Sequence, residues 1–465
     1  MAPIEVSSLG QPPDEMLRFI LQHGAVSELG ARLGQLTIHD KPVIHTPHYI
    51  VPTSRGAIPH VSQDILRKHT RISAAYVSLE DFIEKLPDNP PIYSTPTQNG
   101  DSALRNFTAL PSQCLSILGP RRVPNIITPA HNTNSSVTIS TSVGFRFLEL
   151  SRYNEALRRL RPDISTCLAD IIPTEGASLK RISRSADRTH AWLRDTIERT
   201  GGDGLRPFFA SVPPLDSPLL SLYLDDLRDE YKEHISGLCI YSPETAAGLP
   251  TYLEHLPRIC VGDPATPQAL LASIHMGVDM MTVPFVTQST ESGIALSFSF
   301  PGSSAAETAQ PLGIDMWSTS HATDTSPLSE GCKCYACRGH HRAYVHHLLQ
   351  ANEMLAWTLL QIHNYSILDS FFEQVRDSIK RHSFEDDVRT FSRVYKPELP
   401  QQTGKGPRIR GYQMRSVGGG EPRKNTKAYG KFDDQLQKLA EAESGVATPD
   451  GDANDIEEHG LAKRL

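Results

Sequence analysis

The sequence predicts an α/β fold built on a parallel sheet, and its length suits a (β/α)8 barrel. Four short apolar runs have the composition of buried strands, and helical stretches lie between them: the runs are 208–213, 235–241, 258–263 and 279–286, and the helical stretches are 218–235 and 266–278. This alternation is typical of parallel strands connected by helices. With 465 residues, 38% hydrophobic and 21% charged, the chain can form one large barrel with extensions or several domains.

The first part of the chain is expected to contain short strands, loops and two helices. Residues 31–65 alternate apolar and polar side chains between Gly and Pro, which is typical of short strands separated by turns. The stretch 86–135 is rich in Pro, Asn, Ser and Thr, and we expect loops there. Helical spacing marks 151–162 and 177–200, and the Gly-rich sequence after the second is expected to end it.

The carboxy-terminal part changes from helix to tail. Apolar residues at helical spacing predict a long helix that includes Tyr344, Leu348, Ala351, Leu355, Leu359 and Ile362, and a further helix is expected over 366–382. Eight basic residues against one acidic residue lie within 401–432, and nine acidic residues against three basic ones lie within 433–465. Such charge blocks with few apolar side chains predict a disordered tail that is first basic and then acidic.

Composition argues against several classes of protein. No stretch reaches 18 apolar residues, so we expect no membrane span, and the first residues lack the basic and apolar regions of a secretion signal. The net charge is −7, and outside the tail the chain is mildly acidic, which does not favour a self-sufficient nucleic-acid binder. Seven cysteines, three of them within six residues, indicate a reducing compartment and a metal site.

The strongest chemical signal is the motif Cys332-x-Cys334-x2-Cys337. Three thiolates at this spacing can converge on one ion and suit Zn²⁺, whereas a redox dithiol or unreactive loop thiols fit the spacing less well. A tetrahedral site needs a fourth ligand, and the spacing alone does not choose among His340, His341, His346, His347 and His363. The remaining cysteines have apolar neighbours and are expected to be small buried side chains: Cys114, Cys167, Cys239 and Cys260.

The segment GCKCYACRGHHRAYVHHLLQANEMLAWTLLQIHN, from Gly331 to Asn364, resembles the zinc-binding region of the queuine/guanine tRNA-ribosyltransferases. In that family a histidine inside a long helix completes the cysteine cluster, and the spacing from Cys337 to His363 matches. A straight helix between these two residues would span about 39 Å, so the chain must reverse or break, for example near Arg338–Gly339. The stretches ARLGQLTI…HTPHYIVPTSRGAIPHVSQDIL and PRICVGDPATPQALLASIHMGVDMM are also similar to the family, and the resemblance covers 31–380.

The resemblance implies an irregular (β/α)8 TIM barrel with a C-terminal zinc-binding helical subdomain and a disordered tail. The implied organisation is an N-terminal extension (1–25), the barrel (26–325), a zinc-binding subdomain that completes the barrel (326–395) and the tail (396–465). It also implies one Zn²⁺ per subunit, held by Cys332, Cys334, Cys337 and His363.

Family members exchange a base in tRNA: an aspartate carboxylate attacks the ribose of a guanosine, guanine leaves and a modified base is installed. In the family, that aspartate is the last residue of a GVDMFD-like motif. The corresponding residues 277–282 of this chain are GVDMMT, so Thr282 occupies the position of the nucleophile. The earlier aspartate of the string is present as Asp279, and we expect a structural role for it. The family's base-cradling glycine-rich loop is replaced by SGLCIYSPE at 236–244, with a tyrosine and a proline that would obstruct or remove backbone contacts. When the sequence is aligned with the family, the base-reading aspartate corresponds to Ala169, or to Asp170 if the alignment is shifted by one residue.

These departures predict that the chain has no catalytic residues of its own. It resembles the non-catalytic branch of the family, whose members form heterodimers with a catalytic queuine tRNA-ribosyltransferase subunit in eukaryotes. The implied function is to support exchange of guanine for queuine at the wobble position of tRNAs with GUN anticodons, with tRNA bound through the complex. The resemblance also implies a cytoplasmic location with peripheral association with the mitochondrial outer membrane.

Two other functions remain open from the sequence. One is an active transglycosylase with displaced catalytic groups. The other is a stand-alone zinc-dependent RNA-binding protein that uses the basic stretch 401–432, although such charge runs are more often solvated tails.

Overall fold

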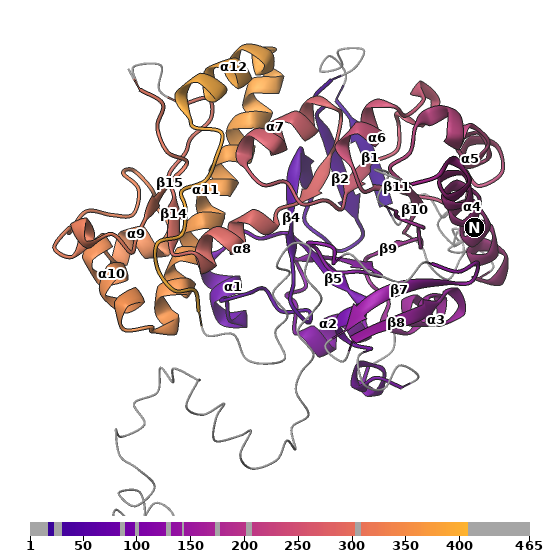
Figure 1. Ribbon diagram of the computed structural model, residues 1–465, viewed down its shortest axis with the longest axis horizontal. Helices are drawn as coiled ribbons and strands as arrows, with labels where there is room; N and C mark the ends of the chain where they lie inside the picture. Colours follow the sequence, from indigo (N-terminus) through magenta and orange to yellow (C-terminus); the bar gives the residue numbers. More distant parts are fainter. Residues whose placement is uncertain are drawn as a thin grey trace, which may run out of the picture.

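Eight short parallel strands close into a barrel, and this closure confirms the predicted (β/α)8 architecture (Figure 1). The computed structural model describes residues 17–22, 30–83, 89–97, 102–126, 132–141, 144–172, 177–200, 207–302 and 308–407. The barrel strands follow one another in chain order, and the last pairs with the first: β4 His48–Pro52, β5 Ala74–Ser78, β6 Leu115–Gly119, β9 Ile164–Thr166, β10 Phe208–Val212, β11 Gly237–Ile240, β12 Arg258–Cys260 and β13 Met280–Thr282.

The barrel strands are buried on both faces, which explains their continuous apolar runs. One set of side chains fills the barrel interior: Ile50, Tyr76, Ile117, Phe209, Cys239, Ile259 and Met280. Gly119 is required where the Tyr76 ring crosses β6, because a Cβ atom at Gly119 would lie 1.9 Å from the Tyr76 hydroxyl oxygen. A small antiparallel sheet packs its apolar side chains on the same cluster; it consists of β1 Leu17–Leu21, β2 Gly34–Ile38 and β3 Ile44–Thr46.

Helices surround the barrel, and the strongly patterned ones lie where the sequence predicts them. Those that match a predicted stretch are α3 Leu150–Leu160, α4 Leu179–Thr200, α5 Ser217–Asp229 and α7 Pro267–His275. The shorter helices are α1 Gln63–His69, α2 Ala103–Thr108, α6 Pro243–Ala247 and α8 Pro284–Glu291, with 3₁₀ turns η2 Leu79–Asp81, η3 Pro91–Ser94, η4 Thr251–Leu253 and η5 Thr319–His321. The Gly-rich sequence after α4 lies outside the described residues.

The prediction of loops throughout 86–135 is wrong in part, because the stretch contains α2 and the barrel strand β6. All five residues of β6 are buried, so the strand has no alternating pattern that would distinguish it from its loop-like neighbours. Beyond it, β7 Ser136–Thr141 and β8 Gly144–Glu149 form an antiparallel hairpin.

The C-terminal subdomain lies on one side of the barrel (Figure 1). It contains β14 Ile294–Leu296, β15 Gly313–Asp315, α9 Tyr335–Gly339, α10 Arg342–Gln350, α11 Met354–Lys380 and α12 Phe384–Val394. The expected single helix over 344–362 is two helices, because the chain turns at Asn352, whose φ angle is +54°. The helix expected over 366–382 is the second half of α11. Among the described residues, no helix is long and apolar enough to cross a membrane.

Residues 396–407, which the sequence assigns to the tail, contact the subdomain. The Lys396 N–H donates to the Gln310 carbonyl at 2.9 Å, and the Thr403 hydroxyl donates to the Asp315 carboxylate. Gly404 lies against the indole ring of Trp317, where an added Cβ atom would be 2.0 Å from Cδ2. The rest of the predicted tail, 408–465, and residues 1–16 and 23–29 lie outside the described residues.

We expect the contact between Gly404 and Trp317 to set the point beyond which the chain can be shortened without loss of stability. A chain that ends at Pro407 should keep the thermal midpoint of the full chain. A chain that ends at Pro400 should unfold at a lower temperature, because it leaves the Trp317 ring uncovered. Gly404→Ala in the full chain should shift the midpoint in the same direction. Equal midpoints for the two shortened chains, measured by calorimetry, would contradict this expectation.

Candidate functional site

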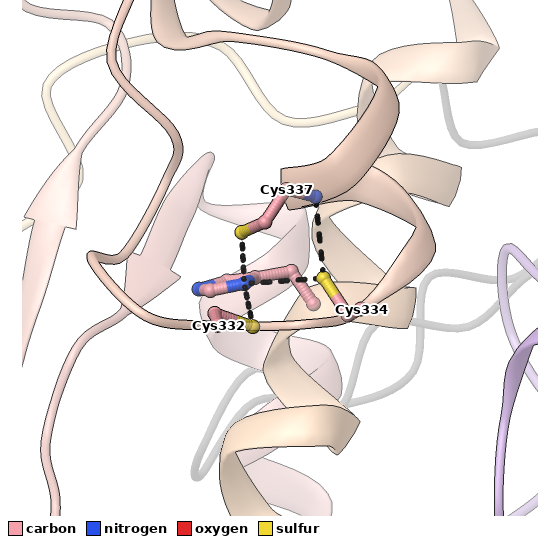
Figure 2. Close-up of side chains that lie close together, drawn as sticks. Cys332, Cys334 and Cys337 are labelled. Carbon is pink, nitrogen blue, oxygen red and sulfur yellow. Dashed lines mark hydrogen bonds between the residues drawn. The ribbon is translucent and has the colours of Figure 1, made fainter.

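The structure brings together four side chains that the sequence separates by 31 positions. Cys332, Cys334 and Cys337 come from the loop before α9 and from α9 itself, and their sulfur atoms surround the Nδ1 atom of His363 from α11 (Figure 2). The distances from Nδ1 to the three sulfur atoms are 3.7, 3.7 and 3.3 Å in chain order. All four ligand atoms lie within 4.8 Å of one another, so the cluster could hold a metal ion.

The orientation of His363 leaves one ring nitrogen available to the cluster. The fully buried ring places Nε2 at 2.8 Å from the Leu296 carbonyl oxygen. A carbonyl can only accept, so Nε2 carries a proton, and Nδ1 is the ring nitrogen that can bind an ion. The next residue, Asn364, accepts from the Leu296 N–H at 2.8 Å and holds the same strand against α11. The imidazole is therefore fixed by its surroundings in the tautomer that a metal ligand needs.

Hydrogen bonds among the thiols also prepare the cluster for a cation. Those with Cys334 and Cys337 hold the pKa of Cys332 far below its usual range, and the same contacts raise the pKa of Cys334. The Cys337 N–H donates to the Cys334 sulfur at 3.3 Å. A bound cation would favour the thiolate form of all three cysteines.

The other histidines that the sequence offers have different partners. His341 begins α10, and its Nδ1 accepts from the Tyr344 N–H at 3.1 Å. His340 stacks on the Tyr344 ring at 5.2 Å, and the Nδ1 of His346 lies 2.9 Å from the Met316 carbonyl oxygen. His347 is exposed on α10. The helix breaks after Gly339, as expected, and the chain turns at Asn352 before α11, which brings His363 back to the thiols.

Thr282 lies at the carboxyl end of β13, where the family's nucleophilic aspartate is expected. The side chain is fully buried, and its hydroxyl donates to the Gly262 carbonyl at 2.5 Å. The same oxygen accepts from the Gly262 N–H at 3.0 Å. The hydroxyl therefore both donates and accepts to join β13 to Gly262, the second residue after β12.

Asp279 precedes β13 and so lies at the opposite end of the barrel from Thr282. Its fully buried carboxylate pairs with the guanidinium of Arg32 and accepts from the Arg258 N–H at 2.7 Å. Arg32 also donates to the carbonyls of Glu254 and Leu256. In parallel barrels this end serves stability rather than chemistry, which agrees with the structural role expected for Asp279.

Asp170 and Ala169 follow β9 at the carboxyl end of the barrel. Asp170 is fully buried and receives two guanidinium groups, from Arg181 at 2.7 and 2.8 Å and from Arg188 at 3.0 Å. Burial raises the pKa of Asp170, but the hydrogen bonds from Arg181 and its neighbours outweigh burial and hold it below its usual value. The contact of these two arginines with Asp170 was not predicted from the sequence. Their spacing of seven residues on α4 is the signal that places both on one side of that helix.

The stretch 236–244 forms β11, a turn and the start of α6 at the carboxyl end of the barrel. Tyr241 directly follows β11, and its hydroxyl lies 3.0 Å from the Ser211 hydroxyl. Tyr241, Tyr76 and Arg121 line a cavity of only about 10 Å³, which is room for at most one water molecule. Sequence reasoning missed Tyr76 and Arg121, because only the closed barrel brings β5 and the residues after β6 to the mouth.

The remaining four cysteines confirm the expectation of small buried side chains. Cys114, Cys167, Cys239 and Cys260 are buried and free. Burial raises the pKa of Cys114 and of Cys239 to about 12, so both thiols stay protonated and unreactive near neutral pH.

Comparisons with known proteins agree with this geometry. The family model described as "Queuine tRNA-ribosyltransferase" matches residues 27–397. A fission yeast (Schizosaccharomyces pombe) protein named queuine tRNA-ribosyltransferase accessory subunit 2 is 34% identical over 83% of this chain and 87% of its own length. Proteins of the same name from Xenopus tropicalis and Drosophila erecta are each 28% identical, over 76% and 77% of this chain and 94% and 88% of their own lengths. With its closed parallel barrel and its Cys3His cluster, the chain belongs to the queuine tRNA-ribosyltransferase family.

Proposed function

We propose that this chain is a non-catalytic accessory subunit of a queuine tRNA-ribosyltransferase. In this role it pairs with a catalytic subunit and supports exchange of guanine for queuine at the wobble position of tRNAs with GUN anticodons. The observation that carries the proposal is Thr282, whose hydroxyl is bound on both sides by Gly262. A neutral hydroxyl that already donates its proton to a carbonyl lacks the negative charge with which a carboxylate attacks a ribose carbon.

Other carboxylates near the barrel give the proposal further support. Asp279 lies at the wrong end of the barrel, and Asp170 is enclosed by two arginines. Asp263 follows β12 at the carboxyl end and is exposed, so it is one candidate for a displaced catalytic role. The relatives named accessory subunits support the heterodimer, with tRNA bound through the complex.

The zinc-binding geometry fits the proposal of one Zn²⁺ per subunit. Tetrahedral zinc, with bonds of about 2.3 Å to sulfur and 2.0 Å to nitrogen, places sulfur and nitrogen about 3.5 Å apart. The distances from Nδ1 of His363 to the sulfur atoms are 3.3 to 3.7 Å, and they lie on either side of this value. Cys332, Cys334, Cys337 and His363 would hold the ion, and four protein ligands leave no position for a reacting water. When bound, the ion would supply a cross-link between the α9 loop and α11.

We further propose that the protein is cytoplasmic and associates peripherally with the mitochondrial outer membrane, as the family resemblance implies. Fractionation of cells that express the full chain tests this location. Protein that sediments with mitochondria and is released by salt or carbonate would support peripheral association. Protein found wholly in the soluble fraction would contradict the membrane part of the proposal.

Base exchange should require both subunits. Purified alone, the chain should incorporate no labelled guanine into tRNA, and it should support incorporation when mixed with a catalytic homologue. Asp263→Asn should leave the activity of the pair unchanged, because the carboxylate has no role in the reaction. Exchange by the single chain would contradict the proposal, and its loss in Asp263→Asn would identify the displaced nucleophile.

Restoring a carboxylate should not restore chemistry. We expect Thr282→Asp to show no exchange and to lower the free energy of unfolding by about 1–3 kcal/mol, because a carboxylate cannot donate to the Gly262 carbonyl. Thr282→Ser retains the hydroxyl and serves as the control, with a smaller loss. Denaturant unfolding measures both variants, and an unchanged stability of Thr282→Asp would show that the two hydrogen bonds to Gly262 contribute little.

Freshly purified protein should contain about one equivalent of zinc. Cys334→Ser and His363→Ala should each lose most of the metal, lower the thermal midpoint and weaken co-purification with the catalytic subunit. His347→Ala removes an exposed imidazole from α10 and should change none of these quantities. Metal analysis by mass spectrometry checks the content; folded, zinc-replete Cys334→Ser protein would refute the site.

A further inference from the structure

Asp170 has no free hydrogen-bonding capacity. Its Oδ1 atom accepts from the Asn132 amide at 2.6 Å and from Arg181 at 2.8 Å. Its Oδ2 atom accepts from Arg181 at 2.7 Å and from Arg188 at 3.0 Å. A carboxylate offers about four lone-pair positions, and here four donors occupy them. No position remains for a donor from a ligand.

The contact with Arg181 has the form of ligand recognition. The planar guanidinium directs two parallel N–H groups at the two oxygens of one carboxylate, which is the bidentate arrangement. Guanine and other cyclic amidines present the same pair of N–H donors along one edge, so Arg181 and such a base would compete for Asp170. The carboxylate is fully buried, whereas the arginine side chains keep 20% and 16% of their exposure, so the arginines cover Asp170 from the solvent side.

The arginines are themselves held in place. Arg188 also donates to the Asn134 side-chain oxygen at 3.0 Å, and the Trp192 indole N–H donates to the Asn134 carbonyl at 2.6 Å. These contacts join α4 to the segment that carries Asn132, whose amide reaches Asp170 from the other side. The adjacent cavity beside Ala169 and Tyr241 holds only about 10 Å³. The cover over Asp170 is thus part of the packed structure.

We propose that Asp170 forms a binding site for a guanidine- or amidine-type pair of N–H donors, and that Arg181, supported by Arg188, is its permanent occupant in this chain. The barrel mouth therefore takes no purine base. This inference rests on the proposed non-catalytic function and gives it a physical cause, which is separate from the missing carboxylate at Thr282.

The test is rescue of a variant by a small guanidine. Arg181→Ala should unfold at a lower temperature than the full chain, and millimolar methylguanidinium should return much of the lost midpoint, because it refills the vacated position. Arg184→Ala, which removes an exposed arginine from the same helix, is the matched control and should gain nothing beyond the effect of potassium chloride at equal ionic strength. If Arg181→Ala yields no folded protein, Arg181→Lys allows the same comparison.

Guanine binding gives a second test that does not depend on rescue. Equilibrium dialysis with labelled guanine should detect no saturable binding, and Arg181→Ala should bind measurably. Saturable binding by the unmodified chain, or methylguanidinium rescue no larger than in Arg184→Ala, would overturn the inference. Base exchange by the two-subunit complex is a separate readout. If the complex exchanges the base but methylguanidinium does not rescue Arg181→Ala, only the inference about Asp170 is contradicted. If methylguanidinium rescues the variant but the complex does not exchange the base, only the proposed function is contradicted.

Discussion

The barrel is closed and buried on both faces, so the polar side chains inside it depend on partners within the protein. Burying an unpaired hydroxyl or carboxylate would cost several kcal/mol. In an enzyme of this architecture some of those partners can come from the substrate. In this chain the partners come from the protein itself: Thr282 is joined to Gly262, and Asp170 to Arg181 and Arg188. Under the proposed function, the same constraint that stabilises the barrel would also remove the vacancies in which a base and a ribose would be bound.

The Cys3His cluster lies in a part of the chain that has little apolar packing of its own. The loop that carries the thiols joins short elements, and the apolar cluster around it is much smaller than that of the barrel. A cross-link to α11 would give this loop a defined position, and α11 in turn contacts the barrel through the hydrogen bond from Tyr49 to Asp369 at 2.6 Å. The proposed metal would thus connect the subdomain surface to the barrel through one helix.

Sequence reasoning found the parts of the fold in which a local pattern reports the structure. The amphipathic helices α3 and α4 and the strand β10 were predictable in this way. The strand β6 was not predictable, because a fully buried strand of five residues has no alternating pattern. The end of α10 was not predictable either, because the apolar pattern continues through the turn at Asn352. The cysteine cluster was evident from spacing, whereas His363 required the family resemblance. The contacts of Arg181 and Arg188 with Asp170 were not predicted, because they depend on how α4 packs against the barrel.

The pairing of β13 with β4 has a consequence for how the protein is made. The ion pair of Arg32 with Asp279 joins residues 247 positions apart, and the hydrogen bond of Tyr49 with Asp369 joins residues 320 apart. During synthesis, the early strands leave the ribosome long before their partners exist, with apolar surface that is destined for the barrel interior. Closure is a late event, and folding is expected to be slow because the decisive contacts are distant in sequence. Until then the nascent chain depends on chaperones or on its own helices to keep that surface from aggregating.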